Sequence, residues 1–169
     1  MRKEWFDLVN ENGERVGRAP RSECHGNPKL LHQAVHVFVF NAAGELFLQK
    51  RSLRKDTQPG KWDTSVGGHV DAGEAPLAAA RRELREELGV TEGEPAFLYQ
   101  YLWRCLVESE LIRSYGLPHE GPFHLQAEEI DEGRFWTLTE IEEKLGRGIF
   151  TDNFEFEWPR ARTALFSAR

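Results

Sequence analysis

The stretch GHVDAGEAPLAAARRELREELGV, residues 68–90, decides the fold of this chain of 169 residues. Between Ala75 and Leu88 the apolar residues recur at helical spacing, and Gly89 follows as a stop signal, so we expect a helix there. At about 100° per residue the apolar residues form one stripe, which is expected to pack on a sheet. The stripe consists of Leu77, Ala80, Leu84 and Leu88.

Three glutamates share the helix face next to this stripe. Glu83, Glu86 and Glu87 are spaced so that like charges meet, at a cost of about 0.2–0.5 kcal/mol per pair. They also lie near the helix C-terminus, where the macrodipole disfavours anions. A divalent metal would offset both costs, because hard cations prefer oxygen ligands. The alternative is a solvated acidic face that is balanced by the neighbouring arginines.

The spacing of Gly68, Glu74 and residues 82–90 is that of the Nudix signature, and on these residues the chain resembles Nudix hydrolases. The resemblance implies an α+β Nudix fold, an α/β/α sandwich with a mixed central β-sheet, as one domain over residues 1–169. It also implies cleavage of a diphosphate bond with Mg²⁺ or Mn²⁺ as the cofactor. The implied metal ligands are the Gly67 carbonyl, Glu83, Glu86 and Glu87.

Other residues of the signature have supporting roles by the same resemblance. Arg82 would orient a metal-binding glutamate, and Glu74 would tie the preceding loop to the helix. Glu83 or Glu86 would accept the proton of the attacking water.

Outside the signature, the chain is similar to the type I isopentenyl-diphosphate isomerase branch of the Nudix superfamily. Three features match: two histidines seven residues apart, a glycine–histidine pair at 68–69, and a Glu-x-Glu at 108–110. They imply a second metal site, with mixed nitrogen and oxygen ligands. Its ligands would be His25, His32, His69, Glu108 and Glu110. The alternative is that these histidines are ordinary surface or hydrogen-bonded residues, as we expect for His36, His119 and His124.

The loop sequence RSLRKDTQPGKW, residues 51–62, supplies two candidate substrate-binding residues. Arg51 and Lys55 match basic residues that hold the diphosphate in the isomerase branch. Arginine presents a fork to phosphate and lysine a point charge. The alternative is that both are solvated loop charges.

The resemblance to the isomerases fails at residue 67. Those enzymes have a catalytic cysteine there, whereas this chain has Gly67, which has no side chain to transfer a proton. We therefore expect a hydrolase that acts on a small organic or nucleoside diphosphate, with isoprenyl diphosphates among the candidates. The alternatives are an isomerase with a rearranged acid, in which Glu110 transfers one proton, and a non-catalytic diphosphate-binding module.

Composition restricts the possible partners. The net charge of −6 argues against broad nucleic-acid binding. The sequence has no apolar run long enough for a membrane span, no apolar leader at its start and only two cysteines, so we expect a reduced, cytoplasmic protein. The oligomeric state stays open, and a homodimer is compatible with the sequence.

Periodicity and turn signals predict the remaining elements. Thr139 is the expected N-cap of a short helix.

Glu128 and Glu129 are weaker metal-site candidates, with an exposed acidic turn as the alternative. Four tryptophans could line a substrate pocket or fill the core: Trp62, Trp103, Trp136 and Trp158. The expected strands are 5–9, 16–19, 32–40, 46–51, 62–67, 97–107, 111–116 and 133–138, and a terminal helix is expected at 154–166.

Overall fold

The computed structural model describes residues 4–167 and contains nine strands and four helices in that range. The strands are β1 (Trp5–Val9), β2 (Arg15–Pro20), β3 (Leu31–Phe40), β4 (Leu46–Arg51), β5 (Trp62–Asp63), β6 (Val66–His69), β7 (Ala96–Arg104), β8 (Ser109–Pro118) and β9 (Ile130–Trp136). The helices are α1 (Arg21–Cys24), α2 (Pro76–Leu88), α3 (Leu138–Lys144) and α4 (Asp152–Phe166).

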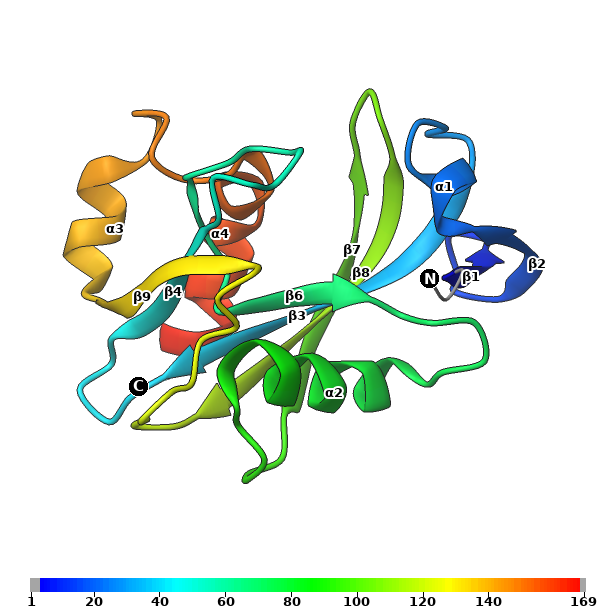
Figure 1. Cartoon of the computed structure of the whole chain (residues 1–169). Helices are drawn as coiled ribbons and strands as arrows, with labels where there is room; N and C mark the ends of the chain where they lie inside the picture. Colours follow the sequence, from blue (N-terminus) through cyan, green and yellow to red (C-terminus); the bar gives the residue numbers. More distant parts are fainter. Residues whose placement is uncertain (1–3, 168–169) are drawn as a thin grey trace.

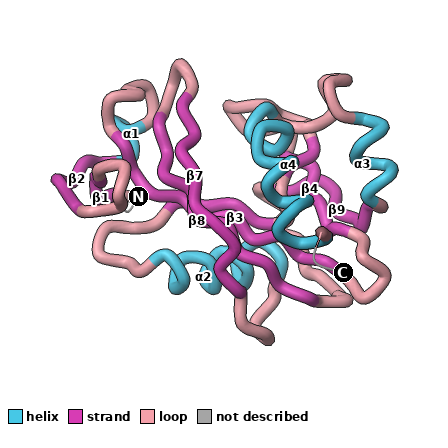
Figure 2. The backbone as a smooth tube through the Cα atoms, turned by 180° about the vertical axis from the view of Figure 1, so that it is seen from behind, coloured by secondary structure: helices cyan, strands magenta, loops and turns pink. Residues whose placement is uncertain are grey.

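Strand β3 is the centre of a mixed sheet, as expected. It pairs in parallel with β8 along its whole length and antiparallel with β6 over residues 34–37. At its two ends it meets β1 and β4, and β4 pairs in turn with β5 and β9. Figures 1 and 2 show the β7–β8 hairpin standing beside β1, β2 and α1.

The two faces of β3 pack against different helices, because successive side chains of a strand point to opposite faces. Val35, Val37 and Val39 pack with the apolar stripe of α2. Phe38, on the other face, belongs to a cluster with Phe154 of α4. Figure 1 shows α2 on one side of β3 and β6, with α4 on the other. The predicted amphipathic helix is therefore confirmed, and Gly89 ends it in the left-handed conformation at φ 68°.

The strand predicted at residues 62–67 is wrong as a single element. Residues 62–63 pair with β4, whereas residues 66–69 pair with β3. Between them, the Ser65 hydroxyl accepts a hydrogen bond from the Val39 N–H at 2.8 Å and donates one to the Phe47 carbonyl. This serine holds the chain at the point where it crosses from one strand to the other.

Thr137, and not the expected Thr139, is the N-cap of α3. Its hydroxyl accepts from the Glu140 N–H, and the Glu140 carboxylate accepts from the Thr137 N–H, which together form a capping box. The preceding strand ends at Trp136, two residues before its predicted end, so the helix begins earlier than expected. Helix α1 was not predicted, because four residues are too few to show a period.

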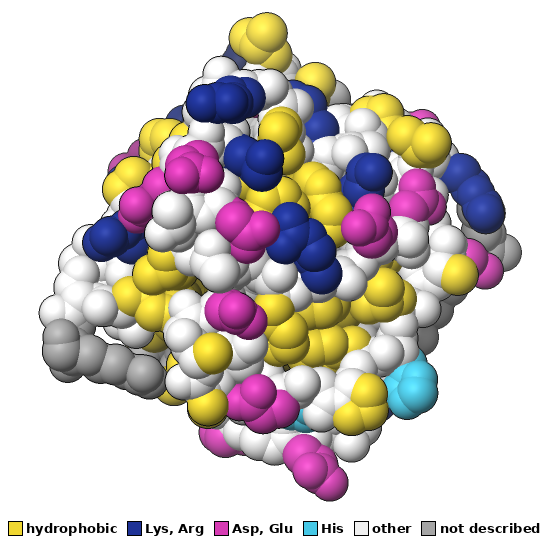
Figure 3. Space-filling model, turned by 90° about the vertical axis from the view of Figure 1, so that its left-hand side faces the viewer, with side chains coloured by type: hydrophobic (Ala, Val, Ile, Leu, Met, Phe, Trp, Pro, Cys, Tyr) yellow, Lys and Arg dark blue, Asp and Glu magenta, His cyan; other side chains and the backbone are white. Residues whose placement is uncertain are grey.

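Three features of the described structure concern membrane spans, the distribution of surface charge and the state of the cysteines. In the part of the chain that the structure describes, no helix has the length and apolar character needed to cross a membrane. On the face in Figure 3, acidic and basic side chains are interspersed, with hydrophobic side chains between them. Both cysteines are free.

Candidate functional site

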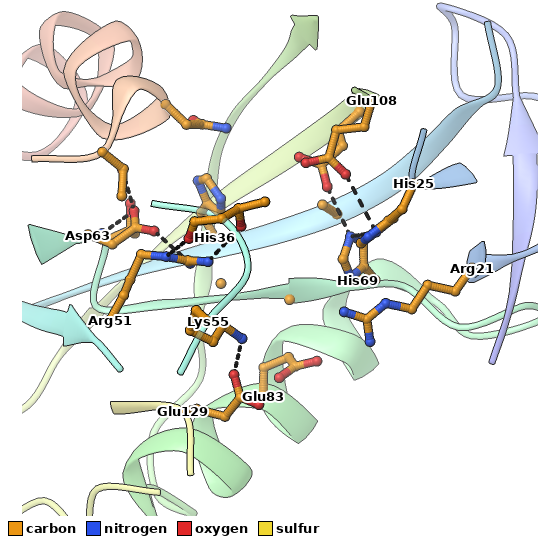
Figure 4. A pocket seen from close by; sticks show the side chains of 18 of the residues that line it. Arg21, His25, His36, Arg51, Lys55, Asp63, His69, Glu83, Glu108 and Glu129 are labelled. Atoms are coloured by element: carbon orange, nitrogen blue, oxygen red, sulfur yellow. Dashed lines mark hydrogen bonds and ion pairs between the residues drawn. The ribbon is translucent and has the colours of Figure 1, made fainter. Parts of the chain in front are cut away.

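A large open cavity of about 1770 Å³ is lined by Ala34 and His36 of β3, whose side chains lie on the face opposite Val35 and Val37, and by Gly67, Gly68 and His69 of β6. Its wall is built from the α2 glutamates, the loop at residues 51–58, the β7–β8 hairpin and the start of α4. Figure 4 shows side chains from these separate segments pointing into it. The cavity contains most of the residues that the sequence singled out.

Strand register brings the predicted histidine and glutamate ligands together. His32 of β3 is the register partner of Glu110 on β8, and Ala34, two residues further on β3, is the partner of His69 on β6. Because residues two apart share a face, these side chains meet on the same side of the sheet. His25 and Glu108 approach from α1 and from the hairpin, respectively.

The resulting cluster has the dimensions of a metal site. Ligand atoms of His25, His32, His69 and Glu108 all lie within 4.8 Å of one another. The Nε2 atoms of His25 and His69 are 3.3 Å apart, and His69 Nε2 is 3.1 Å from Glu110 Oε1. Glu110 is thus in contact with the group, as a fifth candidate ligand.

Two atoms of the cluster are buried without a hydrogen bond to any described residue. They are His32 Nε2 and Glu108 Oε2. A buried polar atom left unpaired costs free energy, so such atoms point to a missing partner. Both are electron-pair donors suited to a divalent cation, and the residues present therefore fit the metal that the sequence implied.

The electrostatics favour the proton-free form of two of the ligands, His25 and Glu110, whereas the pKa values of His32 and Glu108 are raised and a bound cation would displace a proton from them. Burial and the neighbouring His69 lower the pKa of His25 to about 4, so its imidazole is neutral at physiological pH. Burial raises the pKa of Glu110, but the adjacent imidazoles of His32 and His69 outweigh it and keep the carboxylate ionised. Neutral imidazole and ionised carboxylate are the forms that bind metal.

Arg82 is the centre of the second group, which comes from the signature helix. Its guanidinium donates to Glu74 at 2.9 Å and to Glu83 at 2.7 Å, and it lies 3.3 Å from Glu86. It also donates to the His69 carbonyl at 2.9 Å. One arginine therefore links the helix carboxylates to the strand that contributes a histidine to the first group.

Glu87 is the most buried of the three helix glutamates. Its carboxylate accepts from the Gln49 amide at 2.9 Å and from the Gly67 N–H at 3.3 Å. Burial, with the nearby Glu83, raises its pKa to about 8. A carboxyl group held in this way would release its proton when a cation binds.

Gly68 is required by the position of Glu83. A Cβ atom at residue 68 would lie 2.2 Å from Glu83 Cδ, which no side chain can accommodate without movement. The glycine of the signature therefore allows the Glu83 carboxylate to lie directly against β6.

The two basic candidates lie on the cavity wall with acidic partners (Figure 4). Arg51 donates to the Thr57 carbonyl at 3.1 Å and lies 3.4 Å from Asp63. Lys55 forms an ion pair with Glu129, which belongs to the acidic turn predicted as a weaker metal candidate. Glu128 does not line the cavity.

Trp103 alone of the four candidate tryptophans lines the cavity. The other three pack together in one core cluster: Trp62, Trp136 and, from α4 itself, Trp158.

His36, expected to be an ordinary surface or hydrogen-bonded residue, is hydrogen-bonded and also lines the cavity opposite Gly67 on β6. Its Nδ1 donates to Glu157 of α4 at 2.6 Å. Burial lowers the pKa of His36, but the Glu157 carboxylate more than offsets this and raises it to about 9. The alternation of His32, Ala34 and His36 along one strand could have revealed that these side chains share a face, whereas nothing in the sequence points to Glu157.

Comparison with known proteins gives a consistent picture. Residues 30–154 match the NUDIX domain family model. The chain is 36% identical over 166 residues to the isopentenyl-diphosphate Delta-isomerase of Streptomyces avermitilis, which covers 95% of this chain and 84% of that protein. It is also 36% identical over 141 residues to the uncharacterised Nudix hydrolase YfcD of Escherichia coli, covering 82% of this chain and 76% of that protein.

Among solved structures, DR0079 of Deinococcus radiodurans is similar to the chain with a TM-score of 0.79 at 28% identity. The match covers 94% of this chain and all of that one. These similarities confirm the expected fold class and the expected Nudix hydrolase type of enzyme. The chain therefore belongs to the Nudix family.

Proposed function

We propose that the chain is a metal-dependent Nudix hydrolase that cleaves a diphosphate bond in a small organic or nucleoside diphosphate, with isoprenyl diphosphates among the candidates. The observation that carries the proposal is the complete carboxylate set of α2 at the cavity, with Arg82 in contact with both Glu83 and Glu86. Within this proposal the protein acts in the cytoplasm with Mg²⁺ or Mn²⁺, and a homodimer stays a prediction.

The chain's own residues have distinct parts in this reaction. Glu83, Glu86, Glu87 and the Gly67 carbonyl would hold a metal, which would neutralise the diphosphate and activate a water. Arg51 and Lys55 would bind the diphosphate from the opposite wall. Burial raises the pKa of Glu83, which brings this carboxylate closer to the range in which it can accept a proton near neutral pH.

A panel of nucleoside, sugar and isoprenyl diphosphates incubated with the protein and Mg²⁺ tests this function. We expect release of phosphate or of a phosphorylated fragment from at least one member. Glu86→Gln should reduce turnover by at least about a hundredfold, because it removes a charge at the reacting centre. The matched control is Glu92→Gln, which changes an exposed glutamate just beyond the signature. No turnover of any member, or full turnover in Glu86→Gln, would contradict the proposal.

The histidine cluster supports a second candidate, an isopentenyl-diphosphate isomerase with a rearranged acid. Glu110 lies in contact with His69 and could transfer one of the two protons, but Gly67 provides no partner for it. Proton NMR of a reaction with isopentenyl diphosphate distinguishes the candidates. Dimethylallyl diphosphate that appears without loss of phosphate would favour the isomerase.

A further inference from the structure

The imidazole of His36 lines the cavity and belongs to neither candidate metal group. Figure 4 shows it on the cavity wall, near Arg51 and Asp63 and across from the His69 side. Its side chain keeps 12% of its surface exposed, and it lines the cavity. A histidine in this place could be a structural anchor, a substrate contact, or both.

The inner nitrogen of the ring is fixed by a buried carboxylate. His36 Nδ1 donates to Glu157 Oε2, and Glu157 is fully buried. Glu157 also accepts from Tyr99 and Tyr101, each at 2.8 Å, and from the Ser114 hydroxyl. Because four donors hold the Glu157 carboxylate in place, and His36 Nδ1 is one of them, the His36 ring is held in one orientation.

His36 is also the charge partner of Glu157. Within the described chain, no lysine or arginine forms an ion pair with this glutamate. A buried carboxylate needs a compensating positive charge, so the pair consists of an imidazolium and a carboxylate. The imidazolium has a second N–H, on Nε2.

This second nitrogen is free. His36 Nε2 makes no hydrogen bond with any described residue, and it is not among the buried atoms that lack a partner. It therefore faces the open cavity. A Cβ atom at residue 67 would lie only 3.2 Å from His36 Cδ2 and 3.5 Å from Nε2. Gly67 leaves open the space in front of the ring that a side chain would occupy.

We propose that His36 is a substrate-contacting residue whose Nε2–H donates to a phosphate oxygen of the diphosphate. The inference rests on the proposed function, because that function supplies the anionic oxygen. Because Glu157 already holds the His36 ring in place, the Nε2–H donor loses little conformational freedom when the substrate binds, which lowers the entropic cost of binding. Gly67 stands where the similar isomerases have a cysteine. Because it has no side chain, the ring of His36 on the neighbouring strand β3 stays accessible to a phosphate.

The test separates the two nitrogens of the ring. In His36→Asn the amide can still donate to Glu157 from the Nδ1 position, but no atom reaches the Nε2 position. The probe is methylenediphosphonate, a diphosphate that cannot be hydrolysed, titrated by calorimetry in the presence of Mg²⁺. We expect His36→Asn to bind it at least about tenfold more weakly, as expected for a lost charge-assisted hydrogen bond. The variant also loses the positive charge beside Glu157, so its unfolding midpoint should fall, and the titration is made at a temperature well below that midpoint.

His124→Asn is the matched control, because it makes the same substitution at an exposed histidine that does not line the cavity. It should leave probe affinity unchanged. Unchanged affinity in a folded His36→Asn variant overturns the inference. Should that variant not fold, nitrogen NMR of ring-labelled wild-type protein decides: the His36 Nε2 signal shifts when the probe binds, and an unmoved signal overturns the inference.

The outcomes also separate this inference from the proposed function. If the wild type binds the probe through His36 but hydrolyses no diphosphate, the function fails and the contact stands. If the wild type hydrolyses a substrate and His36→Asn has normal affinity and KM, the function stands and the contact fails.

Discussion

Two adjacent glycines, Gly67 and Gly68, determine much of what the cavity can do. Neither has a positive φ, so neither is required by the backbone conformation. Each instead lies against a neighbouring side chain: a Cβ atom at residue 67 would be a tight 3.2 Å from the His36 ring, and one at residue 68 would overlap the Glu83 carboxyl at 2.2 Å. At both positions the absence of a side chain leaves room for a group that comes from another element.

Gly68→Ala should therefore reduce activity by displacing Glu83. The added methyl group would overlap Glu83 Cδ at 2.2 Å, and a displacement of about 1 Å at a catalytic group can cost about a hundredfold in rate. Steady-state hydrolysis measures the effect. Gly17→Ala is the control, because its Cβ would meet Leu8 at an ordinary 3.7 Å. Equal activity in both variants would refute the close contact.

The raised pKa of Glu87 gives a second prediction at this scale. Between its ordinary pKa near 4.5 and about 8, the folded protein holds a proton that the unfolded chain releases. The metal-free protein should therefore lose stability as the pH rises through this range, by at most about 1.36 kcal/mol per pH unit from this group. Urea unfolding with a chelator, at about pH 5.5 and pH 7.5, should show a smaller loss in Glu87→Gln. The same loss in both proteins would exclude Glu87 as its source.

At the scale of elements, local signals predicted the helices and strands well where one element packs on one face. The apolar stripe of α2 and its end at Gly89 could be predicted from the sequence, because the helix packs through one face and both signals lie within the helix segment itself. The segment 62–67 was misjudged, because its two halves pair with different strands, and periodicity contains no information about partners. The partner of His36 could not be predicted for the same reason: Glu157 reaches it from α4, 121 residues away in the sequence.

The N-terminal boundary of α3 can be tested by mutating Thr137, its N-cap in the structure, and Thr139, the N-cap expected from the sequence. Thr137→Ala should destabilise the protein by about 1 kcal/mol, because it removes the capping box. For a chain of this size that corresponds to a fall of about 2–4 °C in Tm. Thr139→Ala, at the exposed position first expected to be the cap, should leave Tm nearly unchanged. A larger fall in Thr139→Ala would support the sequence-based boundary instead.

At the scale of the whole molecule, two sets of possible metal ligands share one cavity. The histidine group comes from β3, β6, β8 and the residues that directly follow α1 and precede β8, and the carboxylates of the second group come from α2. The resemblance to Nudix hydrolases and their isomerase branch implied both sets of ligands, which stay predictions, but it did not indicate how the two sets are connected. That connection is Arg82, which contacts the His69 carbonyl as well as Glu83.

Metal binding should therefore raise stability in two separable parts. A ligand at about a hundred times its Kd stabilises the folded state by about 2.7 kcal/mol, or about 5–10 °C in Tm for a chain of this size. Thermal unfolding with Mn²⁺ and after chelation measures the total. His25→Ala should remove only the part due to the histidine group, and Glu86→Gln only the part due to the helix. If either variant alone abolished the whole shift, the two groups would form one centre, with Arg82 holding its halves together.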